Sequence, residues 1–249
     1  MRILATYNLK GGVGKTATAV NLAWLAASEG ARVLVWDMDP QGAASFYFRT
    51  KPKIKGSSKA LVRGKLDLDD LVLGTEYDNL DLLPADFSYR RMDVHLDDQH
   101  KPVKQMIRLL RPLSDNYDFV FLDCAPSISV VSETVFKVAD ALLIPLIPTT
   151  LSLRTFYQIN DFMKKKKING VKMLPFFSMV DRRKRLHNDI VVNMPVKWPQ
   201  MLKTNVPYAS DIEKMGVNRA AVGDFARTTP AAHAYKALWQ EIKSKLDLV

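Results

Sequence analysis

The residues with the clearest chemical potential form a glycine-rich segment near the N-terminus, GGVGKT at residues 11–16. An apolar run at 3–8 precedes it and a stretch with helical periodicity, 14–29, follows, which is the strand–loop–helix context of a phosphate-binding loop. Glycines let successive backbone N–H groups point at phosphate oxygens, and the helix N-terminus adds the positive end of its dipole. Lys15 can then reach the β- and γ-phosphates, and the Thr16 hydroxyl can bind Mg²⁺ directly.

The standard pattern G-x-x-x-x-G-K-[ST] has its first glycine at position 9, where this chain has Leu9, and Lys10 follows directly. The segment NLKGGVGKTATAVNLA resembles the deviant Walker A motif of the ParA/MinD family of ATPases, whose lysine at this position crosses a dimer interface to the partner's phosphates. The resemblance implies an ATP-dependent sandwich homodimer in which Lys10 and Lys15 stabilise phosphoryl transfer. The loop residues expected to bind nucleotide are Lys10, Gly11, Gly12, Val13, Gly14, Lys15, Thr16 and Ala17.

Two acidic segments extend the resemblance. WDMDPQG at 36–42 is similar to the family's switch I, and FVFLDCAPS at 119–127 is similar to its Walker B and switch II segments. The resemblance implies that Asp37 and Asp123 hold Mg²⁺ through water and that Asp39 orients or activates the attacking water. The composition of residues 39–42 also suits a simple turn.

Two positions in the loop depart from the family pattern. Ala17 replaces a residue that commonly carries a hydroxyl, and Leu9 replaces a polar residue; neither change is expected to abolish nucleotide binding. The family also closes two loops over the purine base. The matching residues here are Met179, Val180 and Asp181 in one segment and Val206, Pro207 and Tyr208 in the other, with ordinary strand ends as the competing interpretation.

Strands alternate with helices along the chain, which favours an α/β fold with a mostly parallel, doubly wound sheet flanked by helices. Ligands then bind beyond the carboxyl ends of the strands. We expect one domain over 1–249, with no room for an N-terminal helix-turn-helix domain. Residues 50–70 are expected to form a loop with short helices, and Pro175 suggests an edge or bulge position. The predicted strands are 3–8, 32–37, 80–85, 117–123, 141–147 and 171–180, and the predicted helices are 14–29, 101–113, 129–138, 151–167 and 230–247.

Composition narrows the classes of function. Lys and Arg number 36 against 26 Asp and Glu in 249 residues, and the net charge of +10 favours a polyanionic partner, either nucleic acid or an anionic membrane. The single cysteine, Cys124, excludes a disulfide framework and the iron–sulfur cluster of nitrogenase-like relatives. No secretion signal or run of 18 apolar residues is present, so we expect a cytoplasmic protein.

Basic clusters in the C-terminal third favour sequence-independent binding to double-stranded DNA, with a nucleoid-associated location. The residues expected to contact DNA are Arg182, Arg183, Lys184, Arg185, Lys203, Lys214 and Arg219. A ParA-type chain would position plasmid, chromosome or other large cargo, and a ParB-like or cargo-adaptor protein would stimulate its hydrolysis. The lysines at 164–167 are explained as well by the negative end of a helix dipole.

Two other classes compete with this interpretation. A MinD-like switch would bind membrane through an amphipathic C-terminal helix, whose apolar stripe is Tyr235, Leu238, Trp239, Ile242 and Leu246. The same stripe is typical of a helix docked on its own domain. A metabolic enzyme with an amidating or carboxylating site would need a further catalytic constellation, and the sequence shows none.

Overall fold

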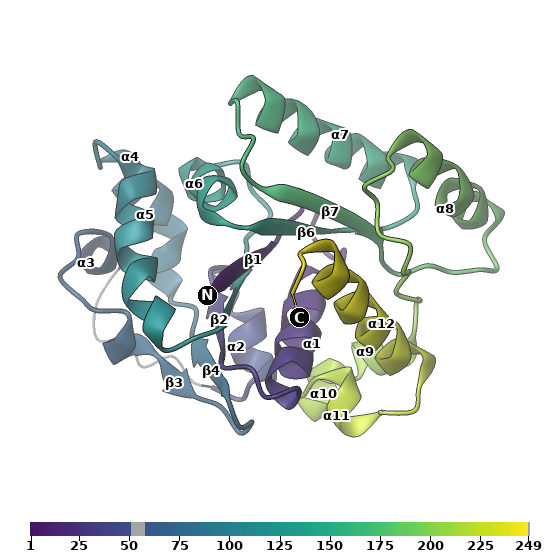
Figure 1. Ribbon diagram of the computed structural model, residues 1–249, viewed down its shortest axis with the longest axis horizontal. Coiled ribbons are helices and arrows are strands. Elements are labelled where there is room, and N and C mark those ends of the chain that lie inside the picture. Colours follow the sequence, from purple (N-terminus) through teal and green to yellow (C-terminus); the bar gives the residue numbers. More distant parts are fainter. Residues whose placement is uncertain (51–57, 249) are drawn as a thin grey trace.

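The computed structural model describes residues 1–50 and 58–248, which form three layers with a twisted sheet between two layers of helices (Figure 1). The sheet has the strand order β3-β4-β2-β5-β1-β6-β7. Every neighbouring pair is parallel except β3 with β4. The strands are β1 (Arg2–Thr6), β2 (Val33–Asp37), β3 (Leu73–Gly74), β4 (Leu80–Leu83), β5 (Phe119–Asp123), β6 (Ala141–Leu146) and β7 (Lys172–Phe177). The predicted fold class is confirmed.

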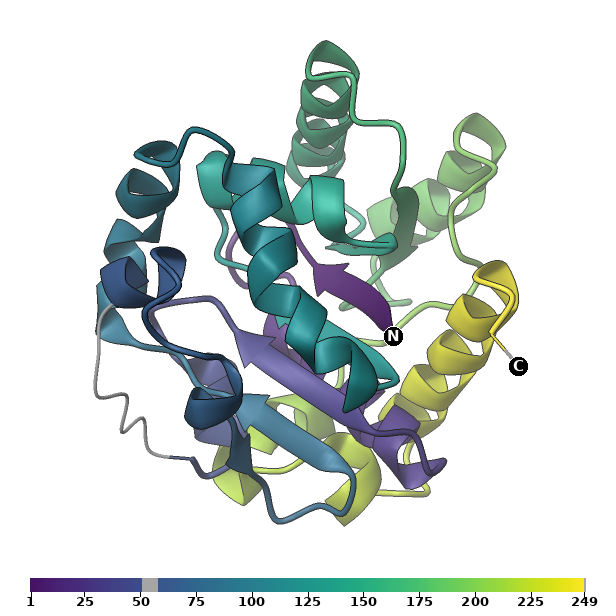
Figure 2. The same cartoon turned by 60° about the vertical axis from the view of Figure 1, so that its left-hand side comes forward.

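Helices cover both faces of the sheet (Figures 1 and 2). One face packs against α1 and α12, together with the short helices α2, α10 and α11, and the other packs against α3 to α8. The helices are α1 (Lys15–Ser28), α2 (Ala43–Tyr47), α3 (Ser58–Val62), α4 (Met92–Asp97), α5 (Pro102–Leu110), α6 (Val130–Val138), α7 (Thr150–Lys165), α8 (Arg185–Lys197), α9 (Ser210–Glu213), α10 (Met215–Asn218), α11 (Val222–Phe225) and α12 (Pro230–Lys245).

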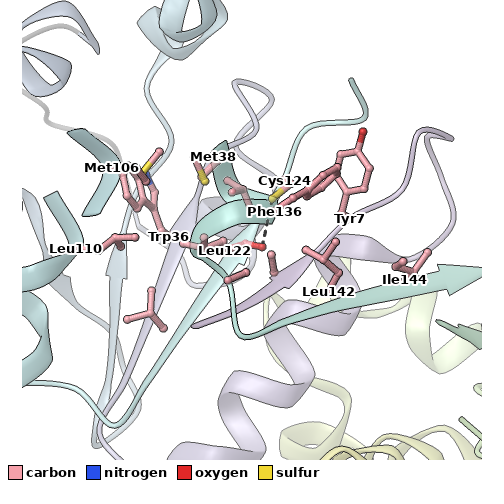
Figure 3. Packing of buried hydrophobic residues seen from close by; sticks show 14 of the residues in the cluster. Tyr7, Trp36, Met38, Met106, Leu110, Leu122, Cys124, Phe136, Leu142 and Ile144 are labelled. Atoms are coloured by element: carbon pink, nitrogen blue, oxygen red, sulfur yellow. Dashed lines mark hydrogen bonds between the residues drawn. The ribbon is translucent and has the colours of Figure 1, made fainter. Parts of the chain in front are cut away.

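Each inner strand supplies both cores, because successive side chains of a strand point to opposite faces. In β5, for example, Leu122 lies in the core under α5 and α6, whereas Phe121 lies in the core under α1 and α12. Figure 3 shows the first core, with Leu122, Leu142 and Phe136 gathered between the sheet and α6. Strands buried on both faces hold their ends rigidly, which suits them to position a site.

Most elements predicted from the sequence are confirmed within about three residues at each end. The elements that were not predicted are β3, which has two residues, α8, whose sequence carries an internal proline, Pro195, and the short helices α2, α4, α9, α10 and α11. Short helices occur at 58–62 and 69–71 as expected, while residues 51–57 of that predicted loop lie outside the described residues.

The expectation for Pro175 is confirmed, because β7 is an edge strand of the sheet. The carbonyl of Pro175 accepts a hydrogen bond from Leu202 N at 2.9 Å, so this residue turns its backbone polar groups to the outer side of β7. The N–H that proline lacks would face the same way, where no strand of the ladder needs it.

Candidate active site

Three neighbouring strands end at the same level of the sheet and bring two carboxylates together. Asp123 at the end of β5 is in register with Asp37 of β2 on one side and Thr6 of β1 on the other. All three side chains are fully buried. Because these strands are parallel, their carboxyl ends share one edge, and the structure therefore brings together the two aspartates that the sequence predicted near a metal ion.

The loop between β1 and α1 lies on this edge. Gly12 and Gly14 have φ angles of +69° and +93°, which glycine adopts freely, and Gly14 occupies the N-cap position of α1. A Cβ at Gly14 would lie 3.0 Å from Ser178 Oγ just beyond β7, so the loop also needs a small residue there.

The N-terminus of α1 carries a row of free backbone donors. No side chain caps the helix, and within the described residues the N–H groups of residues 11–17 donate to no acceptor. Such groups, together with the helix dipole, make an anion-binding site. The geometry therefore matches the phosphate-binding loop expected from GGVGKT.

Lys15 is buried, although it is a cation. Its Nζ donates to the carbonyl of Lys10 at 3.4 Å. Burial lowers the pKa of Lys15, and the negative charges of Asp123 and Asp39 partly oppose this effect. The ammonium group therefore lies within electrostatic reach of both carboxylates at the end of the sheet.

The two buried carboxylates are only half satisfied. Asp37 Oδ2 accepts hydrogen bonds from Ser45 N at 2.8 Å and Ser45 Oγ at 2.7 Å, and Asp123 Oδ1 accepts one from Thr6 Oγ1 at 3.1 Å. Asp37 Oδ1 and Asp123 Oδ2 are buried and have no donor among the described residues. A buried carboxylate oxygen without a partner is costly, so these two oxygens call for a cation or a proton.

Burial and a neighbouring negative charge raise both pKa values. The pKa of Asp37 rises to about 6, first through burial and then through the charge of Asp39. The pKa of Asp123 rises to about 7, first through burial and then through the charge of Asp37, while the nearby hydroxyls of Thr16 and Thr6 oppose the rise. A divalent cation would satisfy the free oxygens, and oxygen ligands are those that Mg²⁺ prefers.

The donor set fits such an ion. Within residues 1–50 and 58–248 no three His, Cys, Asp or Glu side chains cluster as a metal site. The predicted set of Asp37, Asp123 and the Thr16 hydroxyl needs no such cluster, because Mg²⁺ usually keeps several waters and few protein ligands.

Asp39 lies in a turn on the same edge. Its Oδ1 accepts from Gln41 N at 3.0 Å, and its carbonyl accepts from Gly42 N at 2.9 Å. Residues 39–42 thus form the turn that their composition suggested. The turn holds Asp39 near enough for its charge to act on Lys15.

Sequence reasoning missed Asn8, which anchors the loop. Its buried Oδ1 accepts from the backbone N–H of Lys10 at 2.9 Å, and its Nδ2 donates to the carbonyl of Pro145 at 2.8 Å. Thr155 Oγ1 of α7 also donates to Asn8 Oδ1, at 3.4 Å. The available signal was a polar residue at the end of an apolar strand, because a buried amide must find partners.

Tyr7 ties the same strand to the segment after Asp123. Its hydroxyl donates to the carbonyl of Ser127 at 2.9 Å, and its ring packs edge-on against Phe136 with centroids 4.6 Å apart. Cys124 is buried beside this contact, and burial raises the pKa of its thiol. Figure 3 shows Tyr7, Phe136 and Cys124 together.

The two segments expected to contact the base lie side by side. Val180 N donates to Val206 O and Tyr208 N donates to Val180 O, each at 3.0 Å. Val206 is fully buried, whereas Tyr208 is 57% exposed. Asp181 is held by Arg183, whose guanidinium keeps the pKa of this carboxylate low, at about 2.

The predicted DNA-contacting residues are all at least partly exposed, but several are already engaged. Arg183 pairs with Asp181 at 2.9 Å, Lys214 pairs with Asp211 at 3.3 Å, and Arg185 lies 3.9 Å from Asp189. Arg219 donates to the carbonyl of Phe46 at 3.0 Å and lies over its ring. Four of these side chains have no acidic partner among the described residues: Arg182, Lys184, Lys203 and Arg219, of which Arg219 is held by Phe46.

The C-terminal helix α12 docks on its own domain. Tyr235, Leu238, Trp239 and Ile242 are at most 2% exposed and pack in the core with α1. Trp239 Nε1 donates to Glu29 Oε2 of α1 at 3.0 Å. No helix of the described residues is long and apolar enough to cross a membrane.

Together, the glycine loop at a helix N-terminus and the aspartates at adjoining strand ends define a P-loop protein of the α/β class. A family model described as an AAA domain matches residues 1–173. The chromosome partitioning protein ParA of Myxococcus xanthus is 33% identical over 76% of this chain and 69% of its own length.

Solved structures have the same fold. An ATP complex of a McdA variant from Cyanothece superposes with a TM-score of 0.86 at 20% identity, covering 100% of this chain and 97% of its own. Cobyrinic acid a,c-diamide synthase from Mycobacterium smegmatis, with a bound ATP analogue and magnesium, has a TM-score of 0.81 at 24% identity, covering 96% and 93%. The chain belongs to the ParA/MinD family of deviant Walker A ATPases.

Proposed function

We propose that this chain is a ParA-type ATPase that binds ATP and Mg²⁺ at the carboxyl edge of its sheet. One observation carries the proposal. Among the described residues, two buried aspartate oxygens have no donor, and they lie at the end of the sheet that also carries the unpaired N–H groups of residues 11–17. Cation ligands and anion ligands on one edge match a magnesium–triphosphate complex.

Each residue then has a distinct role. The N–H groups of residues 11–17 bind phosphate oxygens, and Lys15 neutralises their charge from its buried position. Thr16, Asp37 and Asp123 would hold Mg²⁺, which when bound neutralises charge on the phosphates. Asp39 orients the water that attacks the γ-phosphate, and its turn keeps it on the side of Lys15.

Lys10 is the residue that would make dimerisation depend on ATP. Its backbone is fixed by Asn8, while its ammonium group has no acidic partner among the described residues. A lysine presented in this way can reach the phosphates of a second copy, and an ATP-bound dimer would follow. Met179, Asp181, Val206, Pro207 and Tyr208 are proposed to border the base.

We further propose that the dimer binds duplex DNA without sequence preference and so associates with the nucleoid of the cytoplasm. Dimerisation doubles the contacting surface, which links ATP binding to DNA binding through valency. A ParB-like or cargo-adaptor protein would stimulate slow hydrolysis and release the dimer from the DNA.

Residues 1–249 act as a single domain in this proposal. The membrane alternative loses support because the apolar stripe of α12 is buried.

The test is binding to a non-specific duplex over a salt series without nucleotide, with ADP, and with ATP and Mg²⁺. We expect tight DNA binding only in the condition with ATP and Mg²⁺, and we expect this binding to weaken steeply as the salt concentration rises. Lys10→Ala should still bind ATP but remain monomeric in size-exclusion chromatography and lose the ATP-dependent gain. Binding that ignores nucleotide, or a Lys10→Ala variant that dimerises with ATP as the wild type does, would contradict the proposal.

A further inference from the structure

A second basic surface lies on α5, away from the cations expected to contact DNA. It consists of six exposed cations, here called the α5 patch: Arg63, Lys65, Lys101, Lys104, Arg108 and Arg111. Figure 1 shows α5 on the flank of the molecule opposite α8, and in Figure 2 the teal helix α5 crosses in front of the sheet. The two basic regions therefore face different directions.

The spacing of the α5 cations puts them on one stripe. Positions 101, 104, 108 and 111 recur at helical intervals of three and four, while Met106, Leu109 and Leu110 face the core. At 1.5 Å per residue, the stripe extends over roughly 15 Å.

The loop after α3 joins this stripe. A Cβ at Gly64, whose φ is +67°, would lie 3.3 Å from Arg108 Cζ, so the guanidinium of Arg108 lies against the backbone of Gly64. Arg63 and Lys65 are the chain neighbours of Gly64, so the patch covers two elements rather than one helix edge.

The charges of the α5 patch are not neutralised. Among the described residues, none of its six cations forms an ion pair, whereas three of the seven cations expected to contact DNA lie within 4 Å of an aspartate. Asp67, Asp69 and Asp70 follow on the next turn and are exposed, yet they make no ion pair with the patch. Holding like charges together without partners costs free energy, which a polyanion would recover.

A groove of about 550 Å³ runs along the stripe and is lined without any acidic residue. Its walls include Lys104, Arg108 and Gln105, and the buried Nε2 of Gln105 has no acceptor among the described residues. The groove offers hydrogen-bond donors from its basic and amide side chains, and Ile107 and Pro112 are the apolar residues among those that line it. No Phe, Tyr or Trp lines the groove, whereas such side chains often anchor protein–protein interfaces, and cations are its commonest charged members.

We propose that the α5 patch binds the phosphate backbone of duplex DNA, as a contact surface separate from the C-terminal cations. About nine phosphates of a duplex occur per 15 Å of its axis, counting both strands, so the stripe can meet several at once. The proposal rests on the proposed DNA binding and assigns it a surface whose cations form no ion pair among the described residues.

The test compares two double variants of the full chain with equal loss of charge. Lys104→Gln/Arg108→Gln removes two cations of the patch, and Lys236→Gln/Lys245→Gln removes two exposed cations of α12 as the control. Both should keep the wild-type melting temperature and basal ATP hydrolysis. With ATP and Mg²⁺, the patch variant should bind a 40-base-pair duplex at least about tenfold more weakly, with a salt slope smaller by about 2, and the control should match the wild type.

The outcomes separate the two proposals. If the wild type binds DNA and the patch variant binds it equally well, the proposal that the α5 patch contacts DNA is wrong, and the proposed function stands. If the wild type binds ATP but no DNA, both the patch and the proposed DNA binding fail, while the ATPase assignment remains. If the patch variant keeps DNA binding but loses binding to phosphatidylserine vesicles or to polyglutamate, a membrane or an acidic protein replaces DNA as the partner.

Discussion

The carboxyl edge of the sheet and the segment from Met179 to Arg219 differ in how their charged groups are held. At the edge, Asp37 and Asp123 are buried on rigid inner strands and keep one free oxygen each. In the C-terminal segment, Arg183 and Lys214 are exposed and already paired with aspartates. A buried charge without a partner is costly and so points to a ligand, whereas an exposed ion pair contributes little and points to none.

The largest expected effect is on ATP turnover, and it tests the role of Asp39 at the carboxyl edge of the sheet. Asp39→Ala should lower the turnover of ATP by about 100-fold while leaving ATP affinity within about threefold, because Asp39 acts on the water and not on the bound nucleotide. Single-turnover hydrolysis and equilibrium binding of a fluorescent ATP analogue measure the two quantities. Asp189→Ala, which removes an exposed carboxylate of α8, should leave turnover unchanged. Undiminished turnover in Asp39→Ala would remove Asp39 from the mechanism.

A second expected effect concerns pH and stability. The folded pKa values of Asp37 and Asp123, about 6 and about 7, lie above the unfolded values, so folding takes up protons between about pH 4 and 7. The contribution of these two carboxyls to stability without Mg²⁺ and nucleotide should therefore be greatest near pH 4 and fall as pH rises through 7. Asp123→Asn should flatten this dependence and raise the free energy of unfolding at pH 8 by roughly 2 kcal/mol.

Urea unfolding at pH 5, 6, 7 and 8 checks this dependence, with Asp189→Asn as the control that should follow the wild type. The same protons compete with Mg²⁺, so ATP affinity in the presence of Mg²⁺ should fall below pH 6. A stability that rises between pH 5 and 8 in the wild type would show that these carboxylates are not strained by their burial.

The smallest expected effect is on the salt dependence of DNA binding, and it compares an unpaired with a paired cation of the C-terminal segment. Lys184→Gln removes a cation without an acidic partner among the described residues and should lower the salt slope of DNA binding by about 0.9. Arg183→Gln removes one half of an ion pair with Asp181 and should change the slope by less. Fluorescence anisotropy over a salt series with ATP and Mg²⁺ measures both. Equal slopes for Lys184→Gln and the wild type would remove Lys184 from the interface.

The amino-acid sequence was enough to predict the family and the fold class, and it predicted which residues lie at the carboxyl edge of the sheet. Loop, switch and strand-end residues from Lys10 to Thr16, with Asp37 and Asp123, could be named because each lies in a short motif next to a strong apolar run. Parallel strands place their ends on one edge, so the local pattern was enough to predict that the two aspartates meet. The long amphipathic helices were predicted for the same reason, since their periodicity is local.

Only the tertiary structure decided which side chains are free and which are engaged. It paired Arg183 with Asp181, buried the stripe of α12 against α1, and fixed Lys10 through Asn8. It also brought Arg63 and Lys65 beside the cations of α5, more than 30 positions later in the chain. Ion pairing, burial and patch formation depend on contacts between distant segments, and a sequence pattern carries no direct record of those distances.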